Sequence, residues 1–121
     1  MLRFLAVATT AILAAAAGAQ AEPVKYTWHG NGINVPGSSK CPGYELDIYL
    51  NHEGDRVWGH WQQRTRVVRP FDFTVAADGS FGGKVDLQAS IMTVKGSVSG
   101  DSVRFDMKGY CIFGGLMKKA E

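Results

Sequence analysis

One segment of the chain gathers side chains of the types that contact ligands. Alternate positions between residues 58 and 66 are occupied by Trp58, His60, Gln62, Arg64 and Arg66. Alternate residues of a β-strand point to the same face, so a strand that stays regular this far presents all five together. Aromatic rings beside guanidinium groups suit a sugar ring, a small anionic ligand or a protein partner. We expect any partner site to centre on this face and to continue into the loop at residues 66–69.

The same face also has a purely structural interpretation. Trp58 would pack against Tyr49 from the neighbouring strand, and the arginines would keep a strand edge soluble. The sequence leaves both interpretations open.

Metal binding and catalysis find little support in the spacing of the polar residues. The three histidines, His29, His52 and His60, do not have the spacing of metal ligands, and Glu53 and Asp55 add no recognised pattern. The eleven acidic residues are spread over predicted strands and turns, so no carboxylate pair for acid–base chemistry is indicated. We therefore expect no enzyme, no metal and no cofactor.

Cys41 and Cys111 are the two cysteines of the chain. In an exported protein the default expectation is a disulfide between them, which would close a loop of about 70 residues and stabilise the fold by roughly 4 kcal/mol. The alternative, a catalytic thiolate, would need a histidine and a carboxylate in a recognisable order.

The N-terminus has the pattern of a signal peptide. Arg3 is followed by an apolar run over residues 4–17, and residues 18–21 (GAQA) form a small-x-small cleavage site. We expect the leader to occupy residues 1–21 and the mature domain residues 22–121, in the periplasm or secreted. The apolar run is too short to span a bilayer, so no membrane span is expected in the mature chain. The 13 Lys and Arg nearly balance the 11 Asp and Glu, which argues against nucleic acid as a partner.

The elements that would position these residues are short strands. Residues 70–87 (PFDFTVAADGSFGGKVDL) alternate apolar and polar side chains on both sides of a glycine turn. If the apolar groups are to share one face, the turn must have three residues with Gly79 in the left-handed region, and Phe73 must pair with Gly83.

Similar alternation marks residues 44–50, 56–64, 92–98 and 103–107, and no segment after the leader has helical periodicity. We predict an all-β fold, an antiparallel meander of seven to eight strands closing into a small barrel with one disulfide. The predicted core consists of Trp28, Leu46, Ile48, Leu50, Val57, Trp61, Phe71, Phe73, Val75, Phe81, Val85, Val94, Val98, Val103, Phe105 and Met107.

The order of turns and strands resembles that of a class of small exported proteobacterial proteins, many of them uncharacterised. The shared elements are Trp28-x-Gly30-x-Gly32, Cys41, YELDIYL, RVWGHW, DGSFGG, VKGSVSGD and Cys111. The resemblance implies an architecture like that of lipocalin-like or avidin-like barrels, and it implies no particular chemistry.

Two function classes follow from these observations. The favoured one is an exported, non-enzymatic binding or inhibitor module of the cell envelope, with an unknown protein, glycan or small anionic ligand as its partner. The alternative is a structural or stress-related periplasmic protein with no specific ligand.

Overall fold

A computed structural model describes residues 22–87 and 90–120, and the predicted signal peptide lies outside them. These described residues form strands almost throughout, and they include one 3₁₀ turn, η1, at Cys41–Gly43. The strands are β1 (Val24–Asn31), β2 (Ile33–Asn34), β3 (Glu45–Glu53), β4 (Arg56–Gln62), β5 (Arg69–Thr74), β6 (Ser80–Leu87), β7 (Ser90–Ser99), β8 (Ser102–Lys108), β9 (Cys111–Leu116) and β10 (Lys118–Lys119). Among the described residues, no helix is long and apolar enough to cross a membrane.

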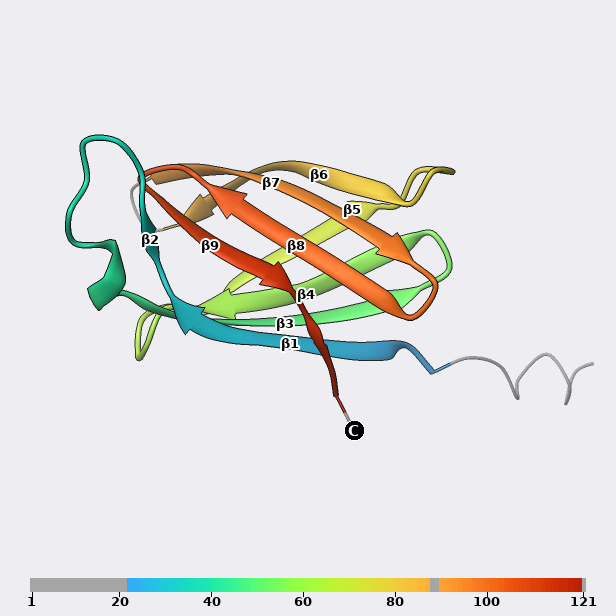
Figure 1. Cartoon of the computed structure of the whole chain (residues 1–121). Helices are drawn as coiled ribbons and strands as arrows, with labels where there is room; N and C mark the ends of the chain where they lie inside the picture. The colour runs from blue at the N-terminus through green and yellow to red at the C-terminus, as the bar shows by residue number, and fades with distance from the viewer. Residues whose placement is uncertain (1–21, 88–89, 121) are drawn as a thin grey trace, which may run out of the picture.

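The strands form two antiparallel sheets that face each other (Figure 1). Sheet A has the order β10-β1-β3-β4-β5, and sheet B has the order β2-β9-β8-β7-β6. The prediction of an all-β antiparallel fold is therefore confirmed. The prediction of a single closed barrel is wrong, because β5 and β6 are the free edges of different sheets and form no ladder with each other.

The turn between β5 and β6 shows why the barrel does not close there. Gly79 has φ +90°, and the hydrogen bonds of Ala76 N–H to Ser80 O (2.8 Å) and Gly79 N–H to Ala76 O (2.9 Å) define the predicted three-residue turn. Beyond the turn, the strands separate and the predicted Phe73–Gly83 ladder pair does not form. The rings of Phe73 and Phe81, 6.0 Å apart, fill the space instead, since facing sheets need about 10 Å and paired strands only about 4.8 Å.

On the opposite side of the sandwich the chain passes from one sheet to the other. It leaves sheet A after β1 and enters sheet B at β2, with Gly32 between them. A Cβ atom at Gly32 would lie 2.8 Å from the Cys41 carbonyl oxygen, so the crossing passes too close to η1 for a larger residue. Cys41 and Cys111 form the predicted disulfide beside this crossing, with their Cα atoms 5.7 Å apart.

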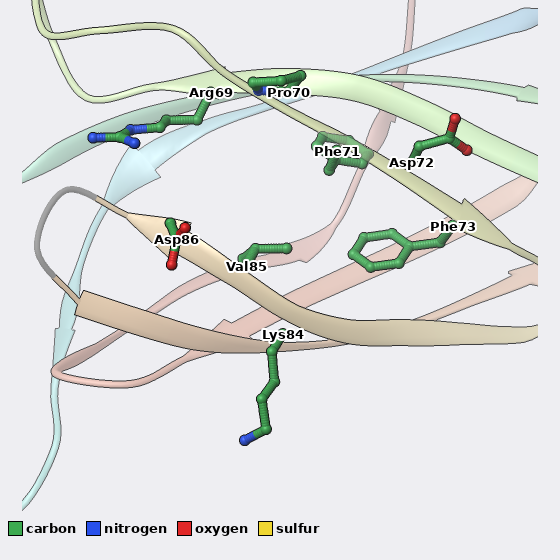
Figure 2. Close-up of a pocket in the computed structure, with 8 residues that line it drawn as sticks. All are labelled: Arg69, Pro70, Phe71, Asp72, Phe73, Lys84, Val85 and Asp86. Atoms are coloured by element: carbon green, nitrogen blue, oxygen red, sulfur yellow. The ribbon is translucent and has the colours of Figure 1, made fainter.

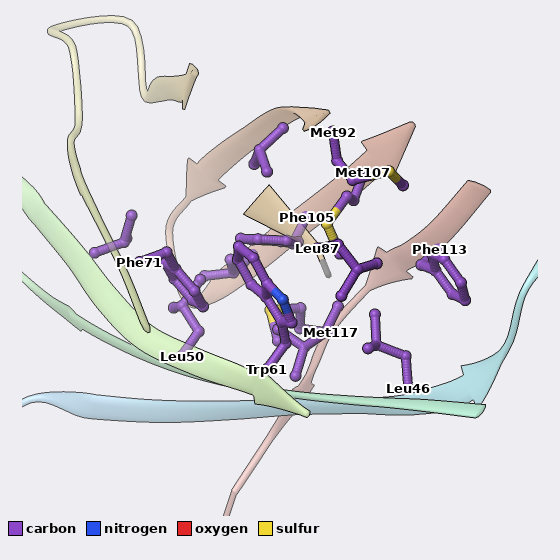
Figure 3. Packing of buried hydrophobic residues seen from close by; sticks show 14 of the residues in the cluster. Leu46, Leu50, Trp61, Phe71, Leu87, Met92, Phe105, Met107, Phe113 and Met117 are labelled. Carbon is purple, nitrogen blue, oxygen red and sulfur yellow. The ribbon is translucent and has the colours of Figure 1, made fainter. Parts of the chain in front are cut away.

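The core lies between the two sheets (Figure 3). It consists of the residues at alternate positions of the strands, whose side chains point inward. Of the predicted core, the buried members are Leu46, Ile48, Leu50, Val57, Trp61, Phe71, Phe81, Val94, Val103, Phe105 and Met107. The partly buried members, which pack against this cluster, are Trp28, Phe73, Val75, Val85 and Val98. They lie toward the margins of the sheets, where the partner sheet covers them less. Tyr26, Leu87, Met92, Phe113 and Met117 are also buried and were not in the predicted set.

Candidate functional site

The outer face of sheet A carries the first three residues of the predicted site. Within β4, Val57, Gly59 and Trp61 point toward the core, while Trp58, His60 and Gln62 point outward and are half-buried. The turn between β3 and β4 fixes the register, because the Glu53–Arg56 pair places His60 opposite Tyr49 and Trp58 opposite Asn51. Gly59 is required at the centre of this ladder, since a Cβ atom there would lie 1.9 Å from the Tyr49 carbonyl oxygen.

Tyr49 is one residue of this face that the predicted site omitted, and Arg56 is the other. The Tyr49 ring lies 4.9 Å from the His60 ring at an interplanar angle of 30°, and 42% of the residue is exposed. The sequence contained the signal that could have found it, because a two-residue turn at Gly54-Asp55 places Tyr49 directly opposite His60. The expected Trp58–Tyr49 packing is replaced by this Tyr49–His60 pair.

Trp58 contacts a different partner. The guanidinium carbon of Arg56, two residues earlier on the same strand, lies 4.8 Å from the centre of the indole ring. Asp72 on β5 fixes that guanidinium by accepting hydrogen bonds from its Nη2 (2.7 Å) and Nε (3.4 Å) atoms. This contact with Asp72 also raises the pKa of Arg56, so the group stays cationic. We call the surface formed by Tyr49, Arg56, Trp58, His60 and Gln62 the aromatic face.

The two predicted arginines do not share this face, because β4 ends at Gln62. Arg64 has φ +54°, which turns the backbone out of the strand, and its guanidinium forms an ion pair with Glu45 at 2.7 Å. The Gln62 side-chain amide donates a hydrogen bond to the Arg66 carbonyl oxygen (2.9 Å), which closes the loop back on the strand end. Arg64 and Arg66 therefore belong to the loop between β4 and β5, beside the aromatic face.

The three histidines lie in separate surroundings. His29 on β1 contacts the Asp47 carboxylate, and this hydrogen bond, followed by the charge of Asp47, raises the His29 pKa above its ordinary value near 6.5. His52 forms a hydrogen bond with the Gly54 carbonyl oxygen at 3.0 Å, and His60 stacks on Tyr49. Among the described residues, no three His, Cys, Asp or Glu side chains are grouped in a way that could hold a metal ion.

A hollow of about 330 Å³ opens where β5 and β6 diverge (Figure 2). Phe71, Phe73 and Val85 occupy the space between the two strands in this view, and Lys84 points away from it. Charged residues, among them Arg69, Asp72 and Asp86, line the rest of the hollow. Charges and a proline, Pro70, on two free sheet edges are the usual means of preventing further strand pairing, so this arrangement protects the open side of the sandwich.

No protein-family model, curated protein or solved structure matches this chain. The resemblance to small exported proteobacterial proteins stays a prediction.

Proposed function

We propose that the protein is an exported, non-enzymatic binding module of the cell envelope, and that its partner is another protein held on the aromatic face. Tryptophan, tyrosine and arginine are the residues that contribute most often to the energetic centre of protein interfaces. The aromatic face brings all three types together on two adjacent strands. The predicted leader and the disulfide support a location outside the cytoplasm, in the periplasm or beyond it.

The observation that carries the proposal is the mutual ordering of these side chains. Asp72 holds Arg56, Arg56 covers one side of Trp58, and His60 stacks on Tyr49. Side chains that are already ordered lose little conformational entropy when a partner binds, and immobilising a flexible side chain costs about 0.5–1.5 kcal/mol. Tyr49, 42% exposed, remains accessible on β3 beside the row formed by the β4 residues.

The alternative function is a structural or stress-related periplasmic protein without a specific ligand. The same contacts agree with it if their role is only to cover the two rings within the fold. If Arg56 covers the Trp58 ring and His60 covers the Tyr49 ring, sheet A needs no partner protein to cover them. The two functions differ in whether removal of the rings changes a binding event or only the stability of the fold.

A capture experiment with matched variants separates them. The tagged protein is cross-linked in its own envelope, and captured partners are identified by mass and then purified for binding in solution. Tyr49→Ser with Trp58→Ser should abolish capture and weaken binding of the purified partner by at least tenfold. Leu116→Ser is the control, because Leu116 is 64% exposed on sheet B and its loss removes apolar surface elsewhere. Equal binding by the double variant, with the fold intact, would exclude the aromatic face as the site.

A further inference from the structure

Basic residues gather at one end of the sandwich. This end, here called the loop end, holds the loops that connect β2 to β3, β4 to β5, and β8 to β9 (Figure 1). The other end, here called the turn end, holds the short turns that connect β3 to β4, β5 to β6, and β7 to β8. The basic residues of the loop end are Lys40, Arg64, Arg66, Arg69 and Lys108. The turn end carries the acidic residues Glu53, Asp55, Asp78 and Asp101. Three basic residues, Lys25, Arg56 and Arg104, lie close to the same turns.

Ion pairs occupy charged residues of both signs at the two ends. At the loop end, the described acidic residues are Glu45, Asp47 and Asp86, of which Glu45 is paired with Arg64 and Asp47 with His29. At the turn end, Arg56 is paired with Asp72. The chain is close to neutral as a whole, with 13 basic and 11 acidic residues, so its charge acts through orientation rather than through a net attraction.

Exposed aliphatic side chains collect at the basic end. Val67 and Val68, in the loop between β4 and β5, are 71% and 48% exposed. Ile33 in β2 is 61% exposed, and Ile91 at the start of β7 is 65% exposed. Four aliphatic residues at the end of a small protein are unusual for a surface that faces only water, and their position between basic residues indicates a specific kind of partner.

We infer that the loop end docks on the surface of an anionic phospholipid bilayer. Basic side chains next to such a surface contact the phosphate groups, and aliphatic side chains enter the boundary between head groups and acyl chains. A purely polyanionic partner would use the basic residues and leave Val67 and Val68 in water. The turn end has charges of both signs and lies at the other end of the sandwich, so docking through the loop end directs the turn end away from the membrane. This inference does not depend on the aromatic face.

Co-sedimentation with vesicles tests the inference. Vesicles of phosphatidylglycerol mixed with phosphatidylcholine should bind the protein, vesicles of phosphatidylcholine alone should bind it weakly, and added salt should release it. Lys40→Gln with Arg69→Gln should weaken binding about 30-fold, since each basic residue at an anionic surface contributes roughly a fivefold factor. Val67→Ser with Val68→Ser should weaken it roughly tenfold through lost apolar burial.

The matched control is Lys118→Gln with Lys119→Gln on β10, which removes the same charge from exposed positions away from the loop end. This variant should bind as the parent does. All comparisons are between variants of one chain, so the N-terminal residues contribute equally to each. Failure of the parent to bind anionic vesicles would overturn the inference, as would equal losses in the control. Strong binding to heparin with no effect of the valine changes would also overturn it, because that result identifies a soluble polyanion as the partner.

Discussion

Phe105 occupies the centre of the aromatic part of the core. Its ring lies 5.0 Å from Phe71, 6.1 Å from Phe81 and 6.5 Å from Trp61, and the residue has no exposed surface. Phe105→Ala should lower the free energy of unfolding by about 3–5 kcal/mol, because the cavity is enclosed by both sheets. Urea unfolding gives the value.

Phe73→Ala is the natural comparison for this measurement. Phe73 is only partly buried at the open edge of sheet A, so water can reach part of the space that its ring leaves. Its loss should cost clearly less than that of Phe105. Equal costs would show that the two edges lie closer together than the structure places them.

His29 should titrate above its ordinary pKa because Asp47 stabilises the imidazolium. A histidine whose pKa is raised on folding adds stability at low pH, below about 6.5, and this stability is lost as the pH rises through the raised value. An NMR titration of the His29 ring measures the pKa directly. Asp47→Asn should lower it, while Asp72→Asn, which removes an acid from another row of the same sheet, should leave it unchanged. A pKa that does not respond to Asp47→Asn would exclude the pair.

Single residues also mark the limit of prediction from the sequence. Alternation placed Trp58, His60 and Gln62 on one face, because three residues of a regular strand need no further information. The same alternation wrongly placed Arg64 on that face, because the strand has already ended where Arg64 adopts a φ of +54°. No local pattern of residue types predicts a non-glycine residue in that conformation.

The tight turns make a prediction for the strands that they join. Gly79 has φ +90°, and a Cβ atom there would lie 2.3 Å from the Val98 carbonyl oxygen; Gly100 has φ +63° with nothing within 4 Å. Gly100→Ala should therefore cost about 1–2 kcal/mol for the left-handed conformation alone. Gly79→Ala should cost more, because its methyl group also disturbs the contact between the turn and β7. Thermal unfolding of the two variants compares them, and equal losses would contradict the close approach.

The β5–β6 segment shows how far strand patterns determine an element. The alternation and the glycine predicted the correct turn, and Pro70 lies in the edge strand β5. The ladder between the two strands was wrong, because the same inward parity is satisfied whether the strands pair directly or face each other across the core. Whether the strands pair or face each other depends on how the rings of Phe71, Phe73 and Phe81 pack between them. Alternation of apolar and polar residues carries no information about this packing.

At the scale of the whole molecule, the disulfide supplies stability that a small core lacks. Cys41 and Cys111 are separated by 70 positions and link the loop before β3 to the start of β9. Cys41→Ser with Cys111→Ser should lower the free energy of unfolding by about 4 kcal/mol, chiefly because the unfolded chain gains freedom. Urea unfolding of this variant and of the oxidised parent tests the prediction. An unchanged urea midpoint would show that the disulfide constrains the unfolded chain little.

The two-sheet architecture was the part of the fold least accessible from the sequence. Strand number and parity are compatible with a barrel as well as a sandwich, and the difference lies at three points: the crossing at Gly32, the crossing at Met117, and the opening between β5 and β6. Each depends on contacts between residues far apart in the chain. The loop end and the turn end likewise become visible only when the strands are aligned.

The proposed binding function is tested most directly by site-specific photo-cross-linking in the cell envelope. A photoreactive phenylalanine analogue is placed at Tyr49, the exposed ring of the aromatic face, and separately at Thr93, which is exposed on the outer face of sheet B. We predict a discrete adduct with one partner protein from position 49 and none from position 93. The absence of an adduct from position 49, or the same adduct from both positions, would contradict the proposal that the aromatic face binds a partner protein.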